Sequence, residues 1–420
     1  MRRRGSCGGF WRGWGMCELG RLIKLEYGAA LLAEFRTGHG FPVFGSNGEV
    51  GRHSKCLVEG PGIIVGRKGS VGKVSWSSES FWPIDTTYFV SATKEKLKWL
   101  YWILYWLPLE RLDTSTGVPG LNRNDVYSLS VFEPSDDEKR MVAQILDTLD
   151  TTIRQTEAII AKLQQVKQGL LHDLLTRGID ANGQLRPPVE QAPHLYKESP
   201  LGWVPREWDL SNLGEKTDWF SGGTPSKAHR LWWSGDIPFL TPKDMKRFEI
   251  EETIENITME AAHFGSKLMS AETVFIVVRG MILAHTFPVC ISSCPLVFNQ
   301  DIKAISGRCD ISSRFLAHWF VANSSMFLRK VTEATHGTKK LDLQILHTTL
   351  IGIPSPEEQT RIVRRIESID HAISVELARH NQTKSLKSAL MDDLLTGRVR
   401  VTALLSGETP VPEEPERESE

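Results

Sequence analysis

A glycine-rich basic segment, residues 66–73, is the first part of the chain whose residue types and spacing could support chemistry. Its sequence, GRKGSVGK, looks like a phosphate-binding P-loop. A P-loop, however, has the spacing Gly-x-x-x-x-Gly-Lys followed by Ser or Thr. Here five residues separate Gly66 from Gly72, and Val74 follows Lys73. The spacing therefore argues against nucleotide hydrolysis at this segment.

A glycine-flexed turn that presents basic and hydroxyl side chains remains, and it has two open interpretations. Its donors suit DNA phosphates or base edges. The alternative is a solvated basic hairpin without a ligand. The candidate DNA contacts in this turn are Arg67, Lys68, Ser70 and Lys73.

Similar residue types gather in turns of the second half of the chain, in the segments SGGTPSK (221–227) and TPKD (241–244). Hydroxyls, backbone amides and lysines in turns can line a DNA backbone. Trp232 and Trp233 lie between these segments, and large aromatic residues of this kind usually belong to a core. The candidate contacts are Thr224, Ser226, Lys227 and Lys243.

Two further candidates follow along the chain. Arg279, in Val-Arg-Gly, is a candidate counterpart of the basic Gly66-Arg67-Lys68 segment. Asn299 and Gln300 carry amides that can pair bidentately with adenine. An amide that caps local backbone is an equally good interpretation of this pair.

The sequence carries no recognisable catalytic constellation. It lacks a strand-following Gly-x-Gly-x-x-Gly, the Asn-Pro-Pro-aromatic run of amino-methyltransferases, His-Glu-x-x-His and Gly-x-Ser-x-Gly. Residues 136–139 (DDEK) place three acidic residues before a lysine, as nuclease sites do, but they open a helix, where carboxylates favour the macrodipole. Cys290 and Cys294 have no second pair of ligands nearby, so neither a metal site nor a catalytic residue is predicted. Six scattered cysteines suit a reducing cytoplasm.

The elements that must position these candidates are duplicated. Residues 117–179 recur as residues 337–399 without a gap, 220 positions later (337 minus 117). Each copy passes through Pro-Ser-x-x-Glu, a capping box, and ends near Asp-Leu-Leu-Thr. So long a period indicates duplication of a globular domain followed by a helix. A repeated chain suits a ligand with two similar surfaces, and duplex DNA is the commonest such ligand.

The end of each copy has apolar residues at the spacing of a coiled-coil seam. Because each helix alone would expose an apolar stripe, the two are predicted to pack on each other. The second seam weakens around residues 380–383, which are polar. The predicted seam residues are Leu146, Leu149, Ile153, Ile160, Leu163, Leu170, Ile366, Ile369, Ile373, Leu386 and Leu390.

The chain of 420 residues is long enough for several domains, and its 40% hydrophobic and 24% charged residues are typical of globular proteins. Net charge is −1, so any DNA-binding surface must be local. The longest aromatic-rich run, 97–109, is too short for a membrane helix. The predicted order is a poorly ordered N-terminus (1–17), a first domain (18–135), a helix (136–179), a linker (180–202), a second domain (203–355), a helix (356–398) and a disordered acidic tail (399–420).

These features together resemble the DNA-specificity subunit of type I restriction–modification systems. The resemblance rests on the repeated helix signatures, on GPGIIVGRKGSVGKV with FWPIDTTYFV, and on SGGTPSK, WWSGDIPFLTPKD, VRGMILAH and FNQDIKAI. It covers roughly residues 18–398. It implies an α+β chain with two mixed α/β target-recognition domains, separated by two long helices that form an antiparallel coiled coil, in a pseudo-two-fold repeat.

The resemblance also implies partners and contacts. Double-stranded DNA would be the ligand, and two modification subunits and the restriction subunits would assemble on the chain. The chain itself would need no cofactor, since S-adenosylmethionine, ATP and magnesium would belong to the partners. Carried over by position, the DNA contacts would include Ser46 and Asn47 in the first domain, and Lys339 and Lys340 before the second helix.

The two domains differ in sequence, which implies two different half-sites. The first has Tyr27-Gly28-Ala29-Ala30 where the second has Gly-Gly-Thr-Pro-Ser. Two other classes of function stay open. One is a stand-alone DNA methyltransferase or nuclease with an unrecognised catalytic site, and the other is a coiled-coil adaptor with no role in DNA binding.

Overall fold

The computed structural model describes residues 15–112, 120–308, 310–333 and 337–406. The chain divides into two compact units, one made of Met1–Ala158 with Leu377–Glu420, the other of Ile159–Glu376. Each unit has its own hydrophobic core. Within the part of the chain that the structure describes, no helix is both long enough and apolar enough to cross a membrane.

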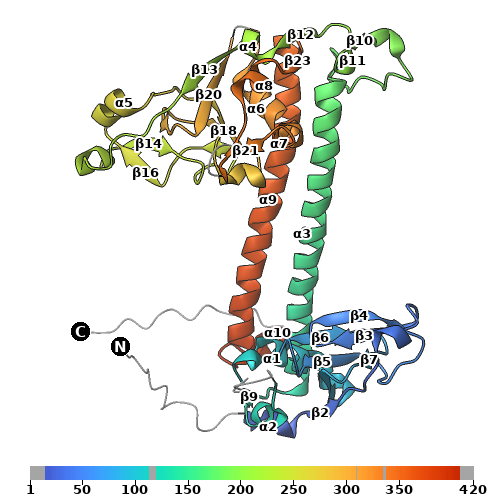
Figure 1. Ribbon diagram of the computed structural model, residues 1–420. Helices are drawn as coiled ribbons and strands as arrows, with labels where there is room; N and C mark the ends of the chain where they lie inside the picture. The colour runs from blue at the N-terminus through green and yellow to red at the C-terminus, as the bar shows by residue number, and fades with distance from the viewer. Residues whose placement is uncertain (1–14, 113–119, 309, 334–336, 407–420) are drawn as a thin grey trace. The chain divides into compact units, whose positions relative to one another are not determined.

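The first unit contains a four-stranded antiparallel sheet in the order β2-β8-β5-β6, beside a three-stranded sheet in the order β4-β3-β7 (Figure 1). Helix α1 contacts the larger sheet and supplies buried tryptophans to its core. The elements are β1 (Met16–Glu18), β2 (Lys24–Tyr27), β3 (Phe41–Gly45), β4 (Gly48–His53), β5 (Gly62–Gly66), β6 (Val74–Ser77), β7 (Trp82–Pro83), β8 (Thr87–Ser91), α1 (Leu97–Trp106), α2 (Arg123–Tyr127) and β9 (Ser130–Phe132), which pairs with β1.

The second unit repeats this plan, with a sheet in the order β13-β20-β17-β18-β15 and another in the order β16-β14-β19. Its sheet elements are β12 (Asp209–Asn212), β13 (Thr217–Ser221), β14 (Ile237–Leu240), β15 (Glu249–Ile250), β16 (Glu255–Ile257), β17 (Val274–Val277), β18 (Val289–Ser292), β19 (Val297–Phe298), β20 (Ile302–Gly307) and β23 (Leu350–Ile353). Its short helices are α4 (Leu213–Lys216), α5 (Met259–Gly265), α6 (Ser313–Ala322), α7 (Ser324–Leu328) and α8 (Leu343–His347).

The predicted duplication is confirmed element by element. Helices α2 and α8 begin at Arg123 and Leu343, and strands β9 and β23 follow each of them at the same distance. Strand β9 pairs with β1, and β23 pairs with β12. The mixed α/β fold predicted for both domains is therefore present twice.

A long helix closes each repeat, α3 (Asp136–Thr176, 41 residues) and α9 (Pro356–Leu395, 40 residues). At the first, Ser135 and Glu138 form the predicted capping box, with the Glu138 N–H donating to Ser135 Oγ and the Ser135 N–H to Glu138 Oε2. At the second, Ser355 Oγ accepts the N–H of Glu358, but the Glu358 carboxylate accepts from Arg186 instead. The second box is therefore only half formed.

Within each unit, α3 and α9 contact each other. In the first unit Asp150 binds Lys387, and Glu157 binds His380. The partner number on α9 falls as the number on α3 rises, so the two helices run antiparallel there. In the second unit Lys167 pairs with Asp370. Polar residues occupy the middle of the seam, as the sequence predicted around residues 380–383.

Most predicted seam residues are buried or half-buried, but the prediction for Leu386 is wrong. Leu386 is 49% exposed, whereas its neighbour Lys387 is 9% exposed. The Lys387 ammonium donates to Asp150 Oδ1 at 2.5 Å and lies 4.5 Å from the Trp102 ring centroid. The ion pair and the aromatic ring turn Lys387 inward, which places Leu386 on the outer side.

The domain boundaries also differ from the prediction. Met16 and Cys17, predicted to be poorly ordered, lie in β1. The predicted linker contains β10 (Tyr196–Ser199), whose Tyr196 is buried, paired with β11 (Gly202–Pro205). In the predicted tail, Val401 is buried and α10 (Thr402–Ser406) follows it. These boundary segments are structured because they pair or pack with other parts of the chain, as β1 does with β9. Residues 1–14 and 407–420 lie outside the described residues.

Candidate nucleic-acid interface

The two predicted contact loops of the first domain lie against each other. The turn at residues 45–48 joins β3 to β4, and the loop at residues 66–73 joins β5 to β6. Lys73 Nζ donates to the Asn47 carbonyl at 2.9 Å and to Asn47 Oδ1 at 2.7 Å. A Cβ added at Gly66 would lie 2.1 Å from Ser70 O and 2.9 Å from Ser46 O. Ser46, Asn47, Ser70 and Lys73 thus form one surface cluster.

The loop at residues 66–73 does not form a phosphate cradle of the P-loop type. Its amides are used internally: the N–H of Gly72 donates to Gly66 O, and the N–H of Val71 donates to Gly69 O. Strand β6 follows the loop, where a P-loop would have a helix. The side chains, rather than the backbone, are what this loop offers to a ligand.

Arg67 and Lys68 begin this loop and differ in their surroundings. Arg67 Nη2 donates to Asp85 O at 2.8 Å, and its guanidinium lies 5.1 Å from the Tyr27 ring centroid. The Arg123 guanidinium lies 5.2 Å from the same centroid. Lys68 is exposed and forms an isolated β-bridge with Gly120. Sequence reasoning missed Tyr27 and Arg123, because a strand end and a helix start carry no DNA-binding motif.

The corresponding loops of the second domain are partly satisfied by their own residues. Thr224 Oγ1 donates to Gln300 Oε1 at 2.7 Å. Lys227 forms an ion pair with Glu255 at 2.8 Å and lies 4.6 Å from the Trp233 ring centroid. A phosphate would therefore have to compete with Glu255 for Lys227. Ser226 and Lys243 are exposed.

Arg279 and Lys340 are backbone partners in an isolated β-bridge, and both are exposed. Lys68 and Gly120 form the same bridge in the first domain. The structural counterpart of Arg279 is therefore Lys68. The match of Val-Arg-Gly with Gly66-Arg67-Lys68 in the sequence would instead place Arg279 opposite Arg67, one residue earlier. Of the two predicted lysines, Lys339 is paired with Glu333 at 2.8 Å, which leaves Lys340 the more available.

The structure favours local capping for Asn299 and exposure for Gln300. Asn299 is 9% exposed. Its Oδ1 accepts the Asp301 N–H at 3.1 Å, and its Nδ2 donates to Asp301 Oδ2 at 3.3 Å. An amide used in this way is not free to pair with a base. Gln300 is exposed beside Thr224, so it remains a candidate for contact with a base.

The tryptophans between these loops follow the core interpretation. Trp233 packs edge-on against Phe239 with centroids 5.1 Å apart, and both Trp232 and Trp233 border a small buried cluster. The segment DDEK at residues 136–139 is also structural. Lys139 is 3% exposed and donates to Glu133 and Asp136, as expected of a helix start rather than a nuclease site.

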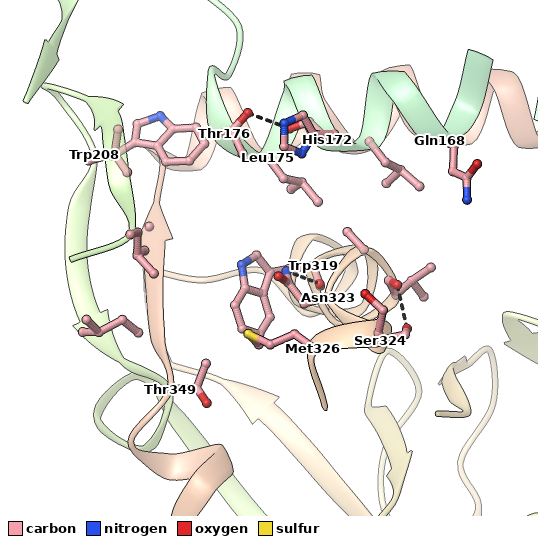
Figure 2. Close-up of a pocket in the computed structure, with 18 of the residues that line it drawn as sticks. Gln168, His172, Leu175, Thr176, Trp208, Trp319, Asn323, Ser324, Met326 and Thr349 are labelled. Atoms are coloured by element: carbon pink, nitrogen blue, oxygen red, sulfur yellow. Dashed lines mark hydrogen bonds between the residues drawn. The ribbon is translucent and has the colours of Figure 1, made fainter. Parts of the chain in front are cut away.

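The second unit also contains a cavity of about 730 Å³ beside α3, α6 and α7 (Figure 2). Trp208, Trp319 and Met326 line it together with Asn323 and Thr349. His172 and Lys330 are the ionisable residues of this lining. General acid–base catalysis of hydrolysis or group transfer would need a second catalytic group beside His172. The lining contains no carboxylate that could serve as that group. Among the described residues, no group of His, Cys, Asp or Glu could hold a metal ion.

The model of the family described as "Type I restriction modification DNA specificity domain" matches residues 12–165 and 205–385. The type I restriction enzyme EcoR124I/EcoR124II specificity subunit of Escherichia coli is 27% identical over 309 residues, covering 72% of this chain and 71% of the relative. The EcoDI specificity subunit, also of Escherichia coli, is 21% identical over 426 residues, covering 94% and 92%.

Solved structures share the fold. The type I restriction–modification S subunit of M. genitalium gives a TM-score of 0.61 at 16% identity, covering 91% of this chain and 96% of that one. The two family matches fall on the two structural repeats. The chain therefore belongs to the family of type I restriction–modification DNA specificity proteins.

Proposed function

We propose that this chain is the specificity subunit of a type I restriction–modification complex and that each of its domains recognises one half of a bipartite, asymmetric DNA site. One observation carries the proposal: the same strand order occurs twice, and the loops at corresponding places carry different side chains. A shared scaffold with different contact residues suits two half-sites of different sequence, because base edges are distinguished by side-chain donors and acceptors.

In this proposal the chain recognises DNA and its partners perform the chemistry. Two modification subunits would bring S-adenosylmethionine, and restriction subunits would bring ATP and magnesium. The complex would act in the cytoplasm, where its DNA substrate lies. The alternative of a stand-alone methyltransferase or nuclease would require a catalytic site within this chain.

The experiment uses the full chain assembled with its modification subunits and maps the methylated bases on a DNA library. We expect one bipartite motif. Exchange of residues 203–355 for the second domain of another family member should change one half of the motif and leave the other half intact. A change in both halves, or no sequence preference in the wild type, would contradict the proposal.

The alternatives give different results with the purified chain alone. A stand-alone enzyme would turn over S-adenosylmethionine, or cleave DNA with ATP and magnesium, without partner subunits. An adaptor would show no salt-dependent DNA binding. The proposed specificity subunit should instead bind DNA with an affinity that falls steeply with salt, because phosphate contacts release counterions.

A further inference from the structure

The two domains place different side chains at the same end of the same strand pair. The antiparallel pairing of β2 with β8 stops at the cross-strand pair Tyr27 and Tyr88, at the end of β2 and near the beginning of β8. Strands β13 and β20 occupy the same places in the second domain, and their pairing stops at Ser221, the end of β13, and Lys303, near the beginning of β20. A cross-strand pair at this end is therefore aromatic in one domain and polar and basic in the other.

The backbone at this position is the same in both domains. A Cβ added at Gly28, which follows Tyr27, would lie 2.2 Å from Ile84 O. A Cβ added at Gly222, which follows Ser221, would lie 2.1 Å from Phe298 O. Both glycines let the chain pass against the end of the short strand β7 or β19. Gly28 is thus the counterpart of Gly222. The first domain therefore has the first glycine of the Gly-Gly-Thr-Pro-Ser segment, although the rest of that segment is absent from its sequence.

In the first domain the exposed ring of Tyr27 rests on the buried Tyr88 and has two guanidinium groups over it. Tyr27 is 50% exposed, and its ring centroid lies 5.1 Å from that of Tyr88. Arg67 and Arg123 both lie over the Tyr27 ring. Burial raises the pKa of Tyr88 to about 12, and its hydroxyl donates to Leu121 O at 3.1 Å. Tyr88 is therefore a fixed support for the exposed Tyr27.

Among the described residues, these positive charges have no acidic partner. Neither Arg67 nor Arg123 forms an ion pair with any of the described residues. In the second domain the Lys303 ammonium donates to the Ser221 hydroxyl, and burial lowers its pKa. Lys303 likewise has no carboxylate partner within the described part of the chain. Exposed or half-buried cations left uncompensated in this way suit an anionic ligand.

Both positions adjoin the candidate contact loops. Arg67 begins the loop at residues 66–73. Ser221 directly precedes the loop that carries Thr224, and Thr224 binds Gln300. A duplex that met these loops would therefore also meet the cross-strand pair.

We propose that this cross-strand pair is a specificity-determining position of each domain, an inference that rests on the DNA-specificity function proposed above. In the first domain Tyr27 positions Arg67 and Arg123 toward base edges, where guanidinium donors match guanine O6 and N7. In the second domain Ser221 and Lys303 present a hydroxyl and an ammonium to a different base. The pair helps to give the two domains different half-sites on one scaffold.

The test compares three variants in the full chain assembled with its modification subunits, using methylation of a randomised DNA library. The variant Tyr27→Ser/Tyr88→Lys gives the first domain the pair of the second. The variant Arg123→Ala removes one of the two guanidinium groups over Tyr27 and leaves the strands unchanged, because Arg123 lies in α2. The variant Tyr105→Ser is the matched control, because Tyr105 is also 50% exposed but lies on α1.

We expect the first two variants to change the base preference at one position of one half-site by about 10-fold or more, as the loss of a base contact does. The other half-site should stay unchanged, and Tyr105→Ser should preserve both. Unchanged preference in both half-sites would overturn the inference, and so would an equal loss of methylation on all sequences, which indicates phosphate contact alone. If the double variant fails to fold, Arg123→Ala decides. Absence of any sequence preference in the wild type would instead refute the proposed function.

Discussion

At the scale of single residues, two glutamates at equivalent helix starts find different arginines. Glu358 and Arg186 are both almost fully buried and share two hydrogen bonds, of 2.5 and 3.0 Å. Glu138 is equally buried, but its partner Arg400 is 41% exposed. The Arg400 guanidinium holds the pKa of Glu138 below its ordinary value. Each arginine comes from the segment that follows the other long helix, so each ties a helix start to a helix end.

Replacing these arginines should have unequal effects. Arg186→Met leaves a buried carboxylate without its cation and should lower the free energy of unfolding of the second unit by about 3 kcal/mol. Arg400→Met removes a partly solvated cation and leaves Glu138 bonded to Ser135, so about 1 kcal/mol is expected for the first unit. Denaturant unfolding of the full chain measures both. Equal losses would contradict the difference in burial.

His318 gives the second unit a pH dependence. Burial lowers its pKa from 6.5 to about 3, and the charges of Lys167 and Arg314 add to the effect. Below pH 6.5 His318 is protonated in the unfolded chain but stays neutral in the folded chain. The free energy of unfolding therefore decreases as the pH is lowered. The loss between about pH 7 and pH 5 should be about 2 kcal/mol. His318→Leu cannot take up that proton, so wild type and variant should diverge in unfolding midpoint over this range. Parallel curves would show that His318 does not titrate in this way.

At the scale of elements, the paired helices combine apolar and ionic contacts. Burial raises the pKa of Asp150, but hydrogen bonds from Lys387 and Arg154 outweigh it and hold the pKa below its ordinary value. An ion pair of this kind fixes the register of two helices, because a shift along the seam would leave a charge buried without a partner.

Two adjacent substitutions on α9 test which residue faces inward. Lys387→Ser breaks the contact with Asp150 and should cost about 2 kcal/mol of unfolding free energy. Leu386→Ser changes an exposed side chain and should cost less than about 0.5 kcal/mol. Thermal or denaturant unfolding of the full chain measures both changes. A larger effect at Leu386 would restore the seam predicted from the apolar pattern.

At the scale of the whole molecule, each long helix begins in one unit and ends in the other. Helices shared in this way by two DNA-reading domains suit a role in setting the distance between half-sites. The spacing of half-sites is a geometric property of such proteins.

Inserting one heptad into α3 after Ala161 and another into α9 after Val375 tests this role, because the antiparallel register places these points opposite each other. The insertions add about 10 Å of helix, or about three base pairs of DNA. Methylation mapping should show a longer spacer between unchanged half-sites. A spacer of the original length would contradict the role of the helices.

The sequence alone determined the features that depend on local pattern. The repeat, the helix starts at Ser135 and Ser355, and the glycine-rich loops are all visible as periodicity, caps and turn residues. These features act over a few neighbouring residues, so composition and spacing are enough to predict them. The sequence predicted that Asn47 and Lys73 both contact DNA, but it did not predict that they contact each other.

Only the tertiary structure decided which side chains meet across long separations in the sequence. It turned Lys387 rather than Leu386 inward, used Asn299 as a local cap, and brought Arg67 and Arg123 onto Tyr27. Strand register and helix packing set these contacts. The residues involved carry no local signal of their partners, because a cross-strand neighbour is chosen by the pairing of whole strands.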